Sequence, residues 1–138
     1  MIEEMAQMMY LAGGVGLAAP QVGIDRQLVI VDIGQGLTAL FNPRVIRRSG
    51  SAVMEEGCLS LPGVHVKVRR ARAVTVTGLD QKNKPVTISA SDLFARALQH
   101  EIDHLRGRVI LDYAHLIDRI RFRRKLRALY RQEAAHGL

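Results

Sequence analysis

Two histidines and a glutamate in the segment Gln99–Leu105 form an H-E-x-x-H pattern, at His100, Glu101 and His104. Residues four apart on a helix lie about 40° apart around its axis, so both imidazoles can bind one metal ion. The glutamate would lie beside the open coordination side, where it can exchange protons with a water. The pattern therefore predicts a hydrolytic metal site on a helix.

A catalytic site of this kind needs a third protein ligand and one open position. Cys58, in the segment E-G-C-L-S, is the strongest candidate by residue type, because a thiolate binds divalent iron, zinc, cobalt or nickel tightly. His65, His115 and His136 are alternative ligands. The spacing of metzincins is not present, since Ile110 stands where those enzymes have a further histidine.

A glycine-rich segment, G-V-G-L-A-A-P-Q, runs from Gly14 to Gln21. It lacks the lysine and the serine or threonine of a phosphate-binding loop, so nucleotide binding is not expected. Its small residues would let the main chain approach a peptide-like substrate closely, and Gln21 adds an amide donor. The alternative is a glycine-rich turn with a surface glutamine.

The elements before the cysteine follow from hydrophobic periodicity. Met1–Ala12 is predicted to be a helix, because its methionines recur at helical spacing and glycines follow it. The methionines are expected to pack in the core. Gln27–Ile33 is predicted to be a strand, and Ala39–Arg48 another that is broken near Asn42–Pro43.

The middle of the chain is predicted to be mostly β. Ser51–Gly63 is expected to be irregular, whereas valines alternate with charged residues from Val64 to Arg69, which predicts a half-exposed strand. The alternation returns at Val74–Val76 and Val86–Ile88, and Asp80–Lys84 supplies a turn between them. These segments predict a β-hairpin.

The helix that carries the histidines is expected to start after Ser91 and to stop near Gly107. Its predicted buried stripe consists of Phe94, Leu98, Ile102 and Leu105. A short strand at Val109–Leu111 and a basic amphipathic helix over about 115–134 would follow. The expected fold is α+β, one domain over 1–138, with antiparallel β-sheets around a central metal-binding helix and a C-terminal amphipathic helix.

Composition narrows the class of protein. A length of 138 residues suits one domain, and no run of eighteen apolar residues predicts a membrane span. Glu3 and Glu4 stand where a secretory signal would carry positive charge, so secretion is not expected. Cys58 is the only cysteine, which excludes an internal disulfide and favours a reducing compartment.

The net charge is +7, and basic residues are concentrated between Arg119 and Arg131. A local basic concentration can bind nucleic acid or the ribosome, and it can equally be a solvated helix face. Both interpretations stay open from composition.

The three segments G-V-G-L-A-A-P-Q, E-G-C-L-S and Q-H-E-I-D-H-L, in this order, resemble the three motifs of peptide deformylases. The resemblance extends from Met5 to about Tyr113. It implies a hydrolase that removes the formyl group from N-formylmethionine of nascent polypeptides and releases formate. Typical members carry some tens of residues before the first helix, whereas this chain begins inside that helix, either because the gene is short or because the segment is truncated.

The resemblance also implies roles for individual residues. Cys58, His100 and His104 would hold one divalent metal ion, Fe(II) natively, with zinc, nickel or cobalt as substitutes. Glu101 would transfer protons, while the Gln21 side chain and the Leu59 backbone N–H would stabilise the oxyanion. The substrate-binding residues would be Val15, Gly16, Leu93 and Ala97.

Partners follow in the same way. N-formylmethionyl nascent peptides are the expected substrates, and neither membrane nor specific DNA is an expected partner. The resemblance implies bacterial cytoplasm or an organelle as the compartment. The basic C-terminal helix would either contact the ribosome or present an ordinary solvated face. Two alternatives to this function stay open. One is an H-E-x-x-H zinc endopeptidase, disfavoured by Cys58. The other is a catalytically idle ribosome- or RNA-binding homologue, disfavoured by the intact Glu101.

Overall fold

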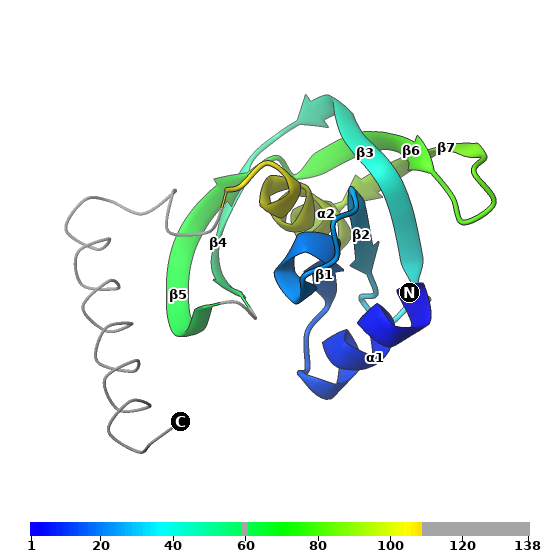
Figure 1. Ribbon diagram of the computed structural model, residues 1–138. Coiled ribbons are helices and arrows are strands. Elements are labelled where there is room, and N and C mark those ends of the chain that lie inside the picture. Colours follow the sequence, from blue (N-terminus) through cyan, green and yellow to red (C-terminus); the bar gives the residue numbers. More distant parts are fainter. Residues whose placement is uncertain (59–60, 109–138) are drawn as a thin grey trace, which may run out of the picture. The chain divides into compact units, whose positions relative to one another are not determined.

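The computed structural model describes residues 1–58 and 61–108 of the chain (Figure 1). Within these ranges the chain forms two compact units. The first unit comprises residues 1–53 and 69–108, and the second comprises 54–58 and 61–68. The expected strand at Val109–Leu111 and the basic helix from His115 lie outside the described residues.

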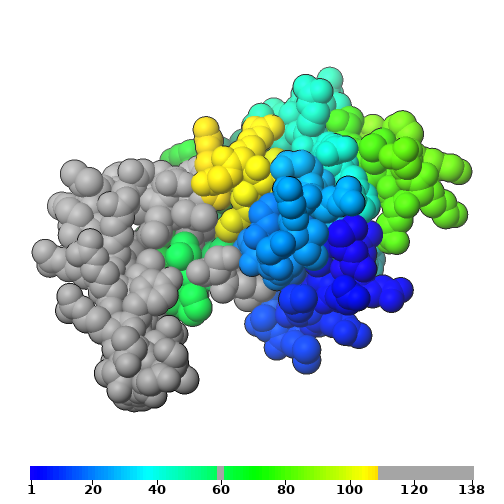
Figure 2. Space-filling model, viewed as in Figure 1, coloured from blue at the N-terminus to red at the C-terminus, as the bar shows by residue number. Residues whose placement is uncertain are grey.

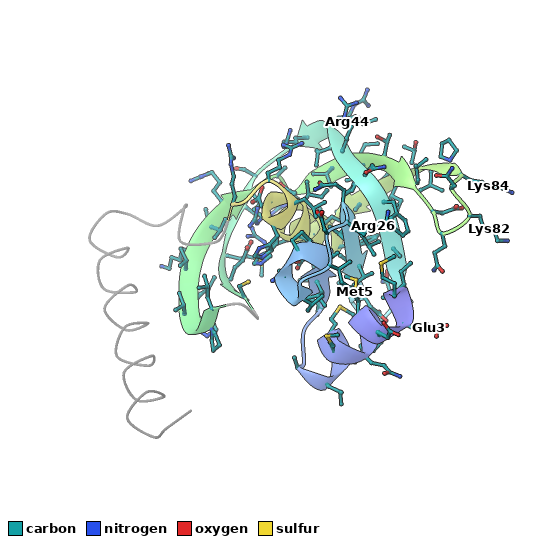
Figure 3. The ribbon with its side chains drawn as sticks, viewed as in Figure 1. Glu3, Met5, Arg26, Arg44, Lys82 and Lys84 are labelled. Carbon is teal, nitrogen blue, oxygen red and sulfur yellow. The ribbon has the colours of Figure 1, made fainter. Side chains whose placement is uncertain are left out.

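The chain begins with helix α1 (Ile2–Leu11), as the methionine periodicity predicted. Met5 and Met9 are fully buried, and they form a core cluster with Leu28 and Ile30 of the sheet. Figure 3 shows Met5 pointing from α1 into the molecule, whereas Glu3 points outward. The expectation that these methionines pack in the core is confirmed.

Five antiparallel strands form the main sheet, in the order β1-β2-β3-β6-β7. Their bounds are β1 Gly16–Ala18, β2 Leu28–Val31, β3 Thr38–Ser49, β6 Ala73–Leu79 and β7 Pro85–Ser91. All four residues of β2 are buried, which agrees with its continuous apolar sequence. The strand β1 lies at one edge of the sheet.

Strand β3 is continuous where the sequence predicted a break. Its pairing with β6 shifts register between Phe41 and Arg44, and Asn42 has a positive φ of 52°. The Asn42 backbone N–H donates to Gln27 O at 2.7 Å. The Asn-Pro dipeptide therefore produces a bulge. In the sequence, such a dipeptide looks the same whether it marks a bulge or the end of a strand.

The hairpin β6–β7 is confirmed, with Val76 opposite Ile88. In its turn the Asp80 carboxylate accepts hydrogen bonds from the backbone N–H groups of Lys82 and Lys84, at 2.8 and 3.0 Å. The two lysine side chains extend away from the sheet (Figure 3). Local side-chain bonding of this kind explains why the polar segment turns.

The expectation that Ser51–Gly63 is irregular was wrong. Strands β4 (Ala52–Cys58) and β5 (Leu61–Arg70) form a separate two-stranded sheet. Most side chains of β4 are exposed or half-exposed, and only Glu56 is buried. A ribbon strand of this kind needs no alternating apolar residues, so periodicity could not reveal it. The alternation predicted for β5 is confirmed, with its valines buried and His65 exposed.

Helix α2 (Asp92–Leu105) carries the H-E-x-x-H pattern and packs against β1, β2 and β7 (Figure 1). Leu98 and Ile102 are buried in a core cluster, and Phe94 and Leu105 pack beside it. Ser91 is the N-cap residue, although its side chain makes no capping hydrogen bond. Gly107 adopts a φ of 76° just after the C-cap, the conformation that glycine tolerates at a helix end.

The α+β class and the antiparallel sheets are confirmed, and α2 packs against the five-stranded sheet. Among the helices in residues 1–58 and 61–108, none has the length and apolar character needed to cross a membrane.

Candidate active site

His100 and His104 project from successive turns of α2. Their ring centroids are 5.0 Å apart, with the ring planes tilted by 52°, and both residues are half-buried. Two imidazoles at this separation can supply nitrogen donors to one ion. The helix can thus offer two of the three ligands that a catalytic site requires.

Glu101 lies between the histidines in sequence and is 5% exposed. Gly16 of β1 approaches it closely, because a Cβ atom built on Gly16 would lie 2.5 Å from Glu101 Oε2 and 2.8 Å from Cγ. Figure 2 shows this end of α2 (yellow) beside the segment that contains β1 (blue). Only a glycine at position 16 leaves room for the carboxylate.

Gln21 belongs to a short 3₁₀ helix, η1 (Ala19–Val22), which directly follows β1 and contacts α2. The Ala18 backbone N–H donates to Gln21 Oε1 at 2.8 Å. Because the carbonyl oxygen of the side chain accepts this bond, the amide nitrogen is turned away from Ala18. The local fold therefore fixes the direction in which the amide nitrogen of Gln21, the donor end of the side chain, can point.

Val15 directly precedes the edge strand β1, and Gly16 is its first residue. Val15 is 43% exposed, and its carbonyl accepts a hydrogen bond from the Asp32 backbone N–H at 2.8 Å. Gly16 pairs with Val31 of β2. An edge strand can bind an extended peptide through its main chain, which is compatible with the expected substrate role of these residues.

Asp32 also links this region to α1. The Tyr10 hydroxyl donates to Asp32 Oδ2 at 2.6 Å. This hydrogen bond is the largest cause that lowers the pKa of Asp32, followed by the hydrogen bond from the Gly34 backbone N–H, and it also raises the pKa of Tyr10. The loop after β2 is thereby tied to the first helix.

Leu93 and Ala97 occupy different environments on α2. Leu93, in the first turn, is 47% exposed, whereas Ala97 is 6% exposed and belongs to a core cluster. The exposed leucine is available to a ligand. A role for either residue in a methionine pocket stays a prediction.

Cys58 is the last residue of β4, in the second unit, and it is half-buried and not part of a disulfide. A Cβ atom on its neighbour Gly57 would lie 3.1 Å from the imidazole of His65, so Gly57 allows that ring to pack against the strand. Leu59 lies outside the described residues. The metal-ligand role of Cys58 and the oxyanion role of Leu59 stay predictions.

Sequence reasoning missed two features of this region. One is the steric role of Gly16 against Glu101, which joins two motifs that lie 85 positions apart in the numbering. The other is the participation of Gln99 and Asp103, the residues that precede the two histidines, in buried polar contacts. Polar residues on the inner side of an otherwise apolar helix are the signal that could have indicated the second feature.

Comparisons with known proteins all point to one family. A family model described as "Polypeptide deformylase" matches residues 1–119. The peptide deformylase of Halothermothrix orenii is 53% identical over 114 residues, which cover 81% of this chain and 74% of the relative. That of Syntrophomonas wolfei is 47% identical over 113 residues, covering 82% and 74% respectively.

Solved structures give the same result. The crystal structure of a peptide deformylase from Legionella pneumophila matches with a TM-score of 0.90 and 42% identity, covering 96% of this chain and 80% of that one. A peptide deformylase from Synechococcus elongatus in complex with actinonin matches with a TM-score of 0.85 and 40% identity, covering 90% and 69%.

Fold and site together define a metal-dependent hydrolase built on an H-E-x-x-H helix. The chain belongs to the peptide deformylase family. Membership places it among the enzymes of protein biosynthesis, and it does not support an endopeptidase or a catalytically idle homologue.

Proposed function

We propose that this chain hydrolyses the formyl amide of N-formylmethionyl nascent peptides and releases formate. The observation that carries the proposal is the close approach of Gly16 to the Glu101 carboxylate. It brings the main chain of the glycine-rich motif, which would bind substrate, against the proton-transfer group of the histidine motif. A hydrolase needs this arrangement, because the general base must lie within hydrogen-bond reach of the water that attacks the bound carbonyl.

The donor set fits a divalent metal. We assign Cys58, His100 and His104 as its ligands, since each is half-buried and offers one ligand atom, a thiolate or an imidazole nitrogen. Fe(II) is the proposed native ion, and the same donors also suit zinc, nickel or cobalt. When bound, such a cation would polarise a carbonyl and lower the pKa of a water molecule.

The chain's own residues would then carry out the hydrolysis. Glu101 accepts a proton from the attacking water while the oxygen of that water bonds to the formyl carbon. Negative charge develops on the formyl oxygen, where the Gln21 amide and the Leu59 backbone N–H donate to it. Glu101 then delivers the proton to the amine nitrogen as the C–N bond breaks, so that formate and the peptide amine leave.

Substrate recognition would use the edge strand and the exposed side of α2. Main-chain groups of Val15 and Gly16 would hydrogen-bond the peptide in strand fashion, and the edge position of β1 in its sheet supports this. Leu93 and Ala97 are proposed to line the methionine pocket. The exposure of Leu93 supports its part in this role more than the burial of Ala97 does.

The experiment is formate release from formyl-Met-Ala-Ser by anaerobically purified, metal-loaded protein. Wild type should release formate, while Glu101→Gln should lower kcat by about 10²- to 10⁴-fold because the proton carrier is lost. Glu3→Gln, on the exposed side of α1, is the matched control and should behave as wild type. The absence of formate release from metal-loaded wild type would contradict the proposed function.

Contact with the ribosome through the basic C-terminal helix is also proposed, from the charge concentration between Arg119 and Arg131. A phosphate-driven contact should weaken steeply as salt rises. Deletion of the residues after Arg119 should therefore abolish co-sedimentation with ribosomes at low salt. Unchanged co-sedimentation would refute this contact without affecting the hydrolase proposal.

A further inference from the structure

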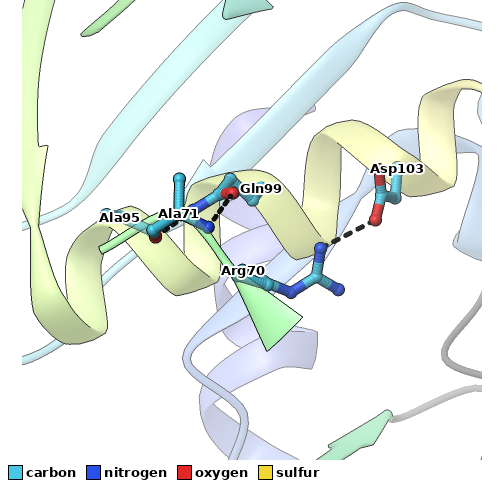
Figure 4. A network of polar contacts seen from close by, with 5 residues as sticks. All are labelled: Arg70, Ala71, Ala95, Gln99 and Asp103. Atoms are coloured by element: carbon cyan, nitrogen blue, oxygen red, sulfur yellow. Dashed lines mark hydrogen bonds and ion pairs between the residues drawn. The ribbon is translucent and has the colours of Figure 1, made fainter. Parts of the chain in front are cut away.

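The last residue of β5, Arg70, and the short connection that follows it to β6 are bonded to α2 at three places. Arg70 Nη1 donates to Asp103 Oδ2 at 2.8 Å (Figure 4). The Ala71 backbone N–H donates to Gln99 Oε1 at 3.1 Å, and Gln99 Nε2 donates back to Ala71 O at 2.9 Å. Further along, the Asp92 backbone N–H donates to Arg72 O at 2.8 Å.

These polar groups are shielded from water. The side chain of Arg70 is 4% exposed and that of Asp103 is 17% exposed, while Gln99 is 8% exposed. Gln99 Nε2 also donates to Ala95 O at 3.0 Å, so its amide is held by main chain on both sides. Removing one partner from a buried pair leaves the other without compensation, which makes such contacts sensitive to substitution.

A fourth contact lies at the start of β4. Arg96 of α2 is 6% exposed, and its Nη2 donates to Ala52 O at 2.8 Å. Ala52 and Arg70 stand on either side of residues 53–69, the stretch that carries Cys58. The two ends of that stretch are thus both bonded to α2, and all the bonded atoms belong to the first unit.

The contacts engage the helix next to its histidines. Gln99 immediately precedes His100, and Asp103 immediately precedes His104. Because the two anchors are one turn apart, a rotation or a slide of α2 would break both. The two bonds therefore fix the rotation of α2 about its axis and its position along that axis, relative to the Arg70–Ala71 segment.

We propose that these contacts, the α2 bracket (Arg70–Asp103, Ala71–Gln99 and Ala52–Arg96), position the metal donors. The bracket would orient the two imidazoles and also set the points from which the Cys58 stretch leaves and re-enters the first unit. This inference rests on the proposed function, in which those three residues are the ligands. None of the bracket side chains is a proposed ligand, so they are positioning residues.

The test measures Co(II) binding to the full-length protein stripped of metal, by competition with a chelator and by the thiolate-to-cobalt charge-transfer band. Arg70→Met should weaken Co(II) binding about 10- to 100-fold, the usual effect of removing groups that orient metal ligands, and should weaken the band. Arg69→Met is the matched control, since Arg69 is the exposed neighbour on the same strand. It should leave both measurements unchanged.

Thermal unfolding of the metal-free variants separates positioning from general stability. A merely structural role for Arg70 would lower Tm while affinity and band stayed at wild-type values, and that result would overturn the bracket. If Arg70→Met does not fold, Asp103→Asn decides, because it keeps the side-chain size and removes the charge. Wild-type affinity in a folded Asp103→Asn protein would likewise overturn the inference.

Failure of the proposed function has a different signature. If wild type binds Co(II) without any thiolate band, Cys58 is not a ligand, and both the proposed donor set and the bracket built on it are wrong. If wild type shows the band and the bracket variants keep the wild-type band and affinity, the donor set stands and the bracket alone fails.

Discussion

The close approach of Gly16 to Glu101 makes the substitution Gly16→Ala a sharp probe of the site. The added methyl would lie 2.5 Å from Glu101 Oε2, 2.8 Å from Cγ and 3.0 Å from Cδ. An ordinary contact between a methyl carbon and these atoms is about 3.5–4.0 Å, so β1 or the carboxylate must move by roughly 1 Å. A displacement of that size can cost about 100-fold in rate, and overpacking typically costs about 1–3 kcal/mol in stability.

The assay is formate release under anaerobic conditions, with kcat and KM determined separately and with metal content measured for each preparation. Gly16→Ala should lower kcat about 100-fold while metal content stays near wild type, because the displaced group is a proton carrier and no ligand. Gly78→Ala is the control. It adds the same methyl to strand β6, where the nearest atoms belong to Phe41 and Leu40, with Phe41 O at 3.1 Å. This variant should lower stability without lowering kcat.

A double substitution tests whether the effect acts through Glu101. If it does, Gly16→Ala combined with Glu101→Gln should be no slower than Glu101→Gln alone, since the carboxylate is already removed. Full additivity of the two losses, or a folded Gly16→Ala protein with kcat within twofold of wild type, would refute the steric reasoning.

Three further changes have defined outcomes. Gln21→Leu should lower kcat about 10²- to 10³-fold because it removes an oxyanion donor; unchanged kcat would remove Gln21 from the mechanism. Leu93→Trp should raise KM for formyl-Met peptides at constant metal content, and an unchanged KM would exclude Leu93 from the pocket. Tyr10→Phe should raise the pKa of Asp32, measured by NMR titration, because the Tyr10 hydroxyl bond is the main cause of its lowering. A lowered folded-state pKa contributes stability that is present above the ordinary carboxyl value and is lost as pH falls through the folded value, so Tyr10→Phe should destabilise at neutral pH and lose its effect in acid. Equal destabilisation at both pH values would contradict this.

The parts of the fold that the sequence predicted correctly are those with a strong local period. Helix α1, strand β5 and the β6–β7 hairpin each bury one regular face, so apolar spacing identified them. Strand β4 was not predicted because it forms a two-stranded ribbon whose side chains are mostly exposed. The sequence does not distinguish the bulge in β3 from a break, because Asn42–Pro43 indicates a local irregularity but not whether strand pairing continues after it.

The sequence by itself determined the chemistry of this protein. The order of its three motifs, which carry a glutamine, a cysteine, and two histidines with a glutamate, predicts the deformylase family, because residue types and their spacing are properties of the chain. Tertiary structure alone decided which groups restrain one another. The contact of Gly16 with Glu101 and the bonds from Arg70 and Ala71 to α2 join residues about 30 to 85 positions apart. Such pairings depend on how strands and helix pack, and no local pattern records them.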